Sequence, residues 1–163
     1  MPDVKNIRKW SELQGLKVSI PSAGKNSGIV EDFYFQTGTN SINALRVQTR
    51  LAGVKALPSN VIGAIVEDAV IIPSEEMLTV RLPPFLLGSS LLNATVKGEN
   101  GKQVGVITEI LIGIVPLNAL RVVGYELTDS SNGRSKRRKI LGADAVLQYD
   151  ENLVVIDNQT ARL

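Results

Sequence analysis

One pentapeptide, Asn-Ala-Leu-Arg-Val, occurs twice in this chain of 163 residues, as Asn43–Val47 and as Asn118–Val122. Other short matches keep nearly the same spacing of 75 to 78 residues: 11–15 with 89–93, 24–28 with 101–105, 68–70 with 144–146, and 78–80 with 153–155. Chance matches would scatter in spacing, whereas short loop insertions would produce a small drift. The sequence therefore predicts two copies of one small module.

The predicted modules cover residues 8–82 and 87–158, with Pro83-Pro84 as a stiff boundary between them. A unit of this size is at the low end of independent stability, because a domain of about 60 residues buries only about 60% of its unfolded surface. We therefore expect the two modules to pack against each other, related by a pseudo-two-fold axis. The apolar Phe85-Leu86-Leu87 should be buried between them.

Each predicted module consists of short strands, because β-branched and aromatic residues alternate with turn formers. The expected strands are 17–20, 28–35 and 43–48 in the first copy and 94–96, 105–112 and 118–124 in the second. Closing hairpins are expected to pair 69–72 with 78–81, and 145–148 with 153–156. With a helical turn near Pro58–Gly63, this makes an all-β chain of two small barrels with five to six strands each. Closure into a barrel would remove exposed strand edges.

Two pairs of corresponding turn positions are predicted to have a left-handed backbone, with positive φ. Gly15 corresponds to Asn93, and these are the residue types that best tolerate positive φ. Gly24-Lys25 and Gly101-Lys102 each precede a predicted strand, as in a tight hairpin. Gly101-Lys102 is not a phosphate-binding Walker loop, because the spacing differs and Gln103 stands where a hydroxyl is needed.

The chain contains neither histidine nor cysteine. This excludes disulfides, thiolate nucleophiles, Cys/His zinc sites and a Ser-His-Asp triad. We therefore expect no enzyme, no metal and no cofactor. Uncharged stretches such as Ile110–Leu120 are all shorter than the about 20 apolar residues that span a bilayer. These features predict a cytoplasmic protein, at most peripheral to a membrane.

Three acidic residues, Glu31, Asp32 and Glu109, lie on predicted strands. Because neighbouring residues of a strand face opposite sides, Glu31 and Asp32 should not cooperate on one metal or as an acid–base pair. We interpret the three as solvated positions or as partners of Arg46 and Arg121. Both arginines fit outward positions in an alternating strand, and the alternative is a pair of equivalent anchors for a protein partner.

A basic run within Arg134–Lys139 follows the turn residues Ser130–Gly133. Its five cations are Arg134, Lys136, Arg137, Arg138 and Lys139. The simplest interpretation is a solvated hairpin tip. The alternatives, in order, are contact with an anionic membrane or acidic protein and contact with RNA. RNA ranks last because the chain offers few aromatic residues for base stacking.

The order of these motifs resembles the PRC-barrel family: Gly15-Leu16-Lys17-Val18, Gly24-Lys25, Gly28–Asp32, and Asp68–Ile71. The second copy matches more loosely, with Asn93 and Glu109 in place of a glycine and an aspartate. The family includes the cytoplasmic part of the photosynthetic reaction-centre H subunit and ribosome-maturation proteins. The resemblance implies a docking or assembly module without catalytic residues. It departs from both relatives, since no membrane helix precedes the barrel and the second barrel is a copy of the first.

The expected function is a non-catalytic adaptor or assembly factor that binds another protein, in a membrane-associated complex of the photosynthetic type approached from the cytoplasmic side. Its candidate contacts are Arg46, Arg121 and the basic run. The alternative is RNA binding or ribosome assembly through residues 134–139. The sequence leaves homo-oligomerisation open.

Overall fold

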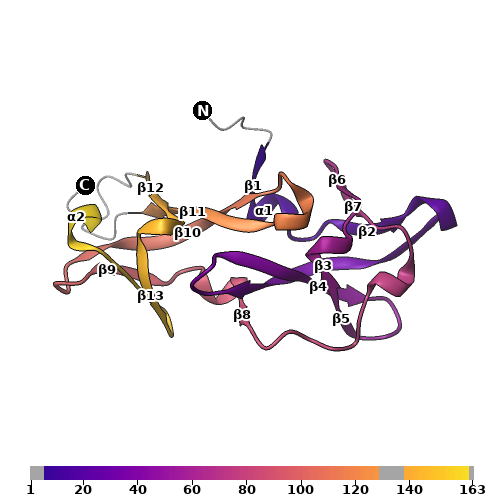
Figure 1. Cartoon of the computed structure of the whole chain (residues 1–163), viewed down its shortest axis with the longest axis horizontal. Helices are drawn as coiled ribbons and strands as arrows, with labels where there is room; N and C mark the ends of the chain where they lie inside the picture. Colours follow the sequence, from indigo (N-terminus) through magenta and orange to yellow (C-terminus); the bar gives the residue numbers. More distant parts are fainter. Residues whose placement is uncertain (1–5, 129–137, 162–163) are drawn as a thin grey trace.

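A computed structural model describes residues 6–128 and 138–161, without the side chains of Arg138, Asn158 and Gln159. The described chain is almost entirely β-structure, as the sequence predicts (Figure 1). Its strands are β1 (Ile7–Lys9), β2 (Lys17–Ile20), β3 (Lys25–Gln36), β4 (Ser41–Thr49), β5 (Val54–Pro58), β6 (Ala64–Ile65), β7 (Ala69–Ile71), β8 (Leu86–Leu87), β9 (Thr95–Gly98), β10 (Gln103–Gly113), β11 (Arg121–Thr128), β12 (Arg138–Gly142), β13 (Val146–Asp150) and β14 (Leu153–Ile156). The helical turns are α1 (Trp10–Leu13), η2 (Pro21–Ala23), η3 (Ser59–Val61), η4 (Glu75–Met77), η5 (Gly88–Leu91), η6 (Leu117–Ala119), η7 (Ala143–Ala145) and α2 (Asn158–Ala161).

The strands join in one continuous sheet. Going outward from its centre, equivalent strands of the two halves follow in the same order. From the central pair β11–β4, one side continues through β10, β9, β14 and β13, and the other through β3, β2, β7 and β6. β7 runs parallel to β2 as β14 runs parallel to β9, and β5 is added to β4 as β12 is to β11. The pairing pattern of the first half of the chain thus recurs in the second half. Figure 1 shows the two halves side by side along the long axis.

The strand register corrects the alignment on which the repeated pentapeptide was based. Phe35 pairs with Ile42, and the matching pair in the second half is Ile112 with Val122. Ile42 therefore corresponds to Val122, and the two pentapeptides occupy different positions. The physical reason is the connection between the strands, which spans residues 37–40 in one half and the longer stretch 114–120 in the other.

The closing hairpin of the first half is also different from the prediction. Residues 78–81 form no strand, and β7 pairs with β6 instead. After η4 the chain runs across β5, where Thr79 and Ala56 exchange two backbone hydrogen bonds of 2.8 Å. In the second half the predicted hairpin is correct, since β13 pairs with β14. The local turn predictions are correct too: φ is +91° at Gly15, +68° at Asn93, +61° at Gly24 and +84° at Gly101.

The two halves exchange their first strands. β1, at the start of the chain, pairs with β10 of the second half, and Lys9 lies opposite Leu111. β8, at the start of the second half, pairs with β3 of the first half, and Leu87 lies opposite Tyr34. At the centre, Ile42 N donates to Leu120 O and Val122 N donates to Asn40 O, both at 2.9 Å. These reciprocal contacts are those of a pseudo-two-fold arrangement.

One hydrophobic core extends through both halves and includes Trp10, Phe33 and Tyr125. The ring centroids of Trp10 and Phe33 lie 4.9 Å apart, edge to face. Gly88 lies against the same Phe33, and a Cβ added at Gly88 would be 2.1 Å from the ring. A glycine is therefore needed there because the backbone approaches the aromatic ring closely. Phe33 consequently joins the exchanged turns α1 and η5.

A second, smaller cluster lies elsewhere on the first half and consists of Tyr34, Ala44 and Ala56. Phe85 and Leu87 pack against it and are half-buried. Leu86 remains 37% exposed. The predicted burial of 85–87 between the two modules is therefore only partly right: alternate side chains are covered, and they are covered by β3, β4 and β5.

Candidate functional site

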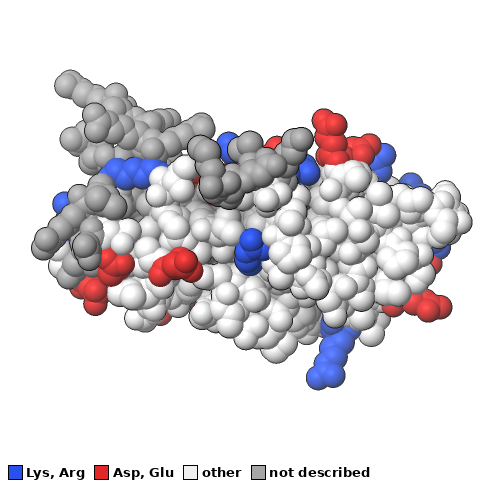
Figure 2. Space-filling view, turned by 45° about the horizontal axis from the view of Figure 1, so that its top comes forward, with Lys and Arg blue, Asp and Glu red and all other residues white. Residues whose placement is uncertain are grey.

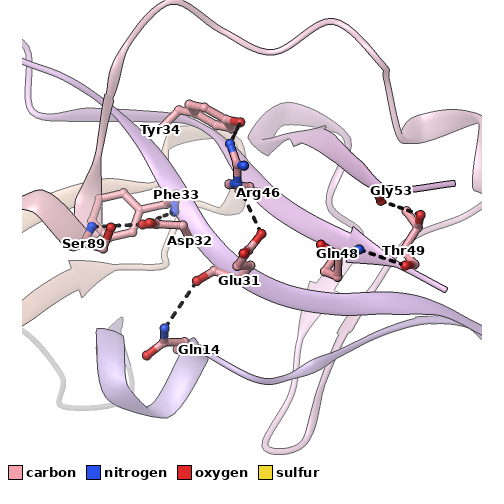
Figure 3. A network of polar contacts seen from close by, with 10 residues as sticks. All are labelled: Gln14, Glu31, Asp32, Phe33, Tyr34, Arg46, Gln48, Thr49, Gly53 and Ser89. Carbon is pink, nitrogen blue, oxygen red and sulfur yellow. Dashed lines mark hydrogen bonds and ion pairs between the residues drawn. The ribbon is translucent and has the colours of Figure 1, made fainter. Parts of the chain in front are cut away.

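Asp32 and Glu109 have equivalent structural roles at the exchanged turns. Asp32 Oδ1 accepts hydrogen bonds from Phe33 N (2.8 Å) and from Ser89 N in η5 (3.0 Å; Figure 3). Glu109 Oε1 accepts from Ile110 N (3.0 Å) and from Ser11 N in α1 (3.1 Å). Each carboxylate thus satisfies backbone donors that a helical turn leaves free at its start.

The prediction of a solvated position is wrong for Asp32, which is 6% exposed, and Glu109 is half-buried. Neither carboxylate pairs with an arginine in the described part of the chain. Strand alternation alone could not reveal the capping role, because Ser89 is 57 residues away from Asp32. No sequence signal available in a single chain would have found it.

Arg46 joins Glu31 to Tyr34, as Figure 3 shows. Its Nε donates to Glu31 Oε2 (3.2 Å), which confirms the predicted partnership, and its Nη1 donates to the Tyr34 hydroxyl (3.1 Å). The hydrogen bond to Tyr34 is the main cause that raises the pKa of Arg46. The guanidinium is only partly covered, with 27% of its side-chain surface exposed. Arg46 therefore remains accessible at the edge of the Tyr34 cluster.

Arg121 is used differently and has no acidic partner among the described residues. Its Nη1 donates to the carbonyl oxygens of Val115 and Ala119, both at 3.1 Å. The side chain therefore holds the connection between β10 and β11 in place. Arg46 and Arg121 are not equivalent, since Arg46 pairs across the sheet with Asp32 whereas Arg121 pairs with Gly113 and Ser41.

Most of the basic run lies outside the described residues, namely Arg134, Lys136 and Arg137. The backbone of Arg138 begins β12, and Lys139 pairs with Leu127 and is half-buried. On the face shown in Figure 2, the charged side chains of the described residues are scattered and form no single basic field. This agrees with the near balance of 18 basic and 16 acidic residues.

An exposed apolar stripe follows the connector between the halves. Val80 is 79% exposed, Leu82 40% and Leu86 37%, and Pro84 between them is exposed as well. Phe85 and Leu87 of the same segment are half-buried and cover Tyr34. We call Val80, Leu82, Pro84 and Leu86 the connector surface. Arg46 lies beside it through its bond to Tyr34.

A groove of about 430 Å³ separates the turn at Thr37–Asn40 from the segment that contains Leu147 and Tyr149. Below it, Tyr149 packs edge to face on Phe35 at 5.3 Å and shares a 2.8 Å hydrogen bond with the hydroxyl of Tyr125. Burial raises the pKa of both tyrosines. Tyr149 lines the groove, and its packing on Phe35 joins the two halves.

Within residues 6–128 and 138–161, no three His, Cys, Asp or Glu side chains come together as metal ligands would. None of the helices in this part of the chain is long and apolar enough to cross a membrane.

No family model and no curated protein matches the sequence. One solved structure with a detectable likeness is the 16S ribosomal RNA processing protein RimM of Pseudomonas aeruginosa. It is 15% identical, the match covers 89% of this chain and 95% of that chain, and the TM-score is 0.32. A TM-score this low does not establish a common fold.

Proposed function

We propose that the chain is a non-catalytic adaptor or assembly factor, built from two tandem PRC-type barrels, that binds another protein through its connector surface. The observation that carries the proposal is the exposure of Val80, Leu82 and Leu86 on a segment that is held in place at both ends. Apolar side chains that lie next to one another on a surface are typical of protein interaction sites.

The connector surface is preorganised for binding. Thr79 is hydrogen-bonded to Ala56 at one end, and Leu86 and Leu87 pair with β3 at the other. Phe85 and Leu87 anchor the underside on the Tyr34 cluster. A partner would therefore meet a fixed apolar ridge and would not have to order a loose loop, which lowers the entropic cost of association.

Arg46 is the charged contact that we assign to this surface. It is partly exposed, it stays cationic, and Tyr34 connects it to the residues beneath the connector. Arginine is enriched among residues that dominate binding energy at interfaces. Arg121 and the basic run (Arg134, Lys136, Arg137, Arg138, Lys139) remain proposed contacts on the sequence argument alone.

The test is recovery of partners by the tagged full chain from its own host, with and without nuclease and detergent. The variant Val80→Ser/Leu82→Ser/Leu86→Ser should lose a defined set of proteins that the unmodified chain retains after nuclease. A control with the same number of substitutions, Ile29→Ser/Leu51→Ser/Leu147→Ser, changes exposed apolar residues outside the connector surface and should retain that set. Because surface substitutions usually change stability by less than about 0.5 kcal/mol, both variants should stay folded. Equal recovery by both variants would refute the connector surface.

The alternative function is RNA binding or ribosome assembly, and it rests on the five cations within Arg134–Lys139. Recovery of ribosomal proteins that disappears with nuclease, and that is lost when these cations are neutralised, would favour it. Recovery of membrane-complex subunits that survives nuclease and disappears with detergent would instead support docking at a membrane.

A further inference from the structure

We propose that the free edge of β12 binds an extended acidic segment of another protein, which adds to the sheet as a further strand. β5, the counterpart of β12 in the first half, already binds an extended segment of this chain, the connector, at its outer edge. β12 lies away from β5 and β8, which hold the two ends of the connector (Figure 1). The edge of β12 and the connector surface are therefore independent, and loss of binding at one would leave the other in place.

Strand register makes Ile140 the counterpart of Ala56. Ala56 is opposite Arg46, and Arg46 is opposite the capping carboxylate of β3. Ile140 is opposite Glu126, and Glu126 is opposite the capping carboxylate of β10. The two residues nevertheless differ in exposure, since Ala56 is 1% exposed and Ile140 is 74% exposed. The connector covers β5 at Ala56, whereas no described residue pairs with the outer edge of β12.

The backbone of Ile140 is oriented to pair outward, like that of Ala56. In an antiparallel pair the N–H and C=O of one residue point to the same side, and successive residues alternate. Ala56 N and O both bond the connector, so they point away from β4. The alternation has the same phase in the second half, because Val30 N and Ile107 N each donate to the residue just before β2 or β9 (2.9 and 3.0 Å). The N–H and C=O of Ile140 therefore face away from β11.

The outer edge of β12 also offers one more donor than that of β5. β5 ends at Pro58, which has no N–H, and the corresponding residue of β12 is Gly142. By the same alternation, the N–H of Gly142 points outward together with that of Ile140. A Cβ added at Gly142 would meet no atom within 4 Å, so the space beside it is open. An edge strand with free backbone groups and an exposed apolar side chain is a template for pairing with another chain.

Charge distinguishes an acidic partner from a second copy of this chain. Five cations lie within residues 134–139 of the sequence, and β12 begins at the last two of them. Pairing of β12 with itself would bring two such runs together, and positive charge on an edge strand opposes that. Glu126, opposite Ile140, is already paired with Lys9 at 3.4 Å and does not balance the run. An acidic segment is therefore the occupant that the charges favour.

The experiment is an NMR titration of the full chain with a synthetic peptide capped at both ends. The peptide has the sequence of residues 76–82 with Arg81→Glu, because this segment pairs with β5 and the change makes it acidic. Saturable amide shifts and slower hydrogen exchange are expected at Ile140 and Gly142. Ala56 should show neither, because the connector already occupies its edge. The peptide that keeps Arg81 should bind severalfold more weakly.

Variants of β12 separate strand pairing from general attraction between charges. Gly142→Pro removes one outward N–H at a position where β5 already has proline. The φ of −68° at Gly142 suits proline, so the variant should fold. Its binding should weaken about two- to tenfold through loss of one hydrogen bond. Ile140→Ser removes the exposed apolar side chain and should weaken binding about tenfold. The control Leu147→Ser changes an exposed leucine of β13 and should leave binding unchanged.

Absence of saturable shifts would overturn the proposal, and so would binding that Gly142→Pro and Ile140→Ser leave unchanged. Equal affinity for the two peptides would overturn the assignment of an acidic partner. A concentration-dependent dimer in sedimentation, lost in Gly142→Pro, would overturn it in favour of a second copy. Melting temperatures close to that of the unmodified chain show that each variant is folded.

Discussion

Two carboxylates hold the exchanged segments of this protein in place. Asp32 and Glu109 each accept one hydrogen bond from the next residue of their own strand and one from the turn that arrives from the other half. Glu31, next to Asp32, instead pairs with Arg46 at the surface. Neighbouring acidic residues therefore have different roles because one faces the exchanged turn and the other faces solvent. Charge-assisted bonds of the buried kind contribute more than exposed ion pairs.

This difference predicts the cost of removing each carboxylate. Asp32→Ala should lower the free energy of unfolding by about 2–3 kcal/mol, because two backbone donors lose a charged acceptor in a buried place. Asp32→Asn keeps an acceptor and should cost less, about 1 kcal/mol. Glu31→Ala removes an exposed pair and should cost less than about 1 kcal/mol. Urea unfolding measures all three. An equal loss in Asp32→Ala and Glu31→Ala would contradict the capping role.

Among the elements, the short strands β1 and β8 determine how the two halves are connected. Each consists of two or three residues and adds to the long strand of the other half. The turns that follow them, α1 and η5, continue the exchange, because Ser11 of α1 donates to Glu109 of β10 and Ser89 of η5 donates to Asp32 of β3. Position in the sequence does not decide whether β1 and β8 pair with β3 or with β10, because these two long strands offer similar edges. The pairing depends on where the preceding and following segments are held.

Because the chain has no cysteine, engineered pairs can test the exchange directly. Lys9→Cys/Leu111→Cys should form an intramolecular disulfide under mild oxidation, since these residues are directly opposite each other. Opposite residues of antiparallel strands have Cβ atoms about 4.5–5.5 Å apart, close to disulfide geometry. Lys9→Cys/Tyr34→Cys, which tests pairing within one half, should not cross-link. Peptide mass spectrometry of the oxidised monomers distinguishes the two. Cross-linking of the second pair alone would refute the exchange.

For the molecule as a whole, the exchange and the shared core mean that neither half is complete alone. The core cluster contains residues of both halves, and β4 pairs with β11 at the centre of the sheet. The hydroxyl contact between Tyr125 and Tyr149, together with the packing of Tyr149 on Phe35, adds a further link. Two barrels joined by a flexible linker would share none of these contacts.

We therefore expect one cooperative unfolding transition for the full chain. Calorimetric and van't Hoff enthalpies should agree, and Asp32→Ala and Glu109→Ala should each shift the entire transition although they lie in different halves. Differential scanning calorimetry measures this. Two resolved transitions, with each substitution affecting only one of them, would show that the halves unfold separately.

The sequence predicted much of the local structure correctly. The strand at Lys17–Ile20, the all-β class, the positive φ at Gly15 and Asn93, and the pair Glu31–Arg46 all follow from alternation and backbone preference, which act over a few residues. Of the candidate site, it named Arg46, whose role as a contact for a partner stays a prediction. It could not identify the connector surface, because exposure depends on which distant strands cover a segment.

The same limit explains the wrong alignment of the repeated pentapeptide. The identical pentapeptides aligned Arg46 with Arg121 in the sequence. Backbone hydrogen bonds between strands do not depend on which side chains are present, and the longer connection before β11 shifted the register. Amino-acid order is sufficient to specify most of the turns and strands and the absence of imidazole and thiol chemistry. Long-range contacts decide which strand pairs with which half and why Asp32 is buried. Those outcomes depend on packing between segments far apart in the chain, and no local preference contains them.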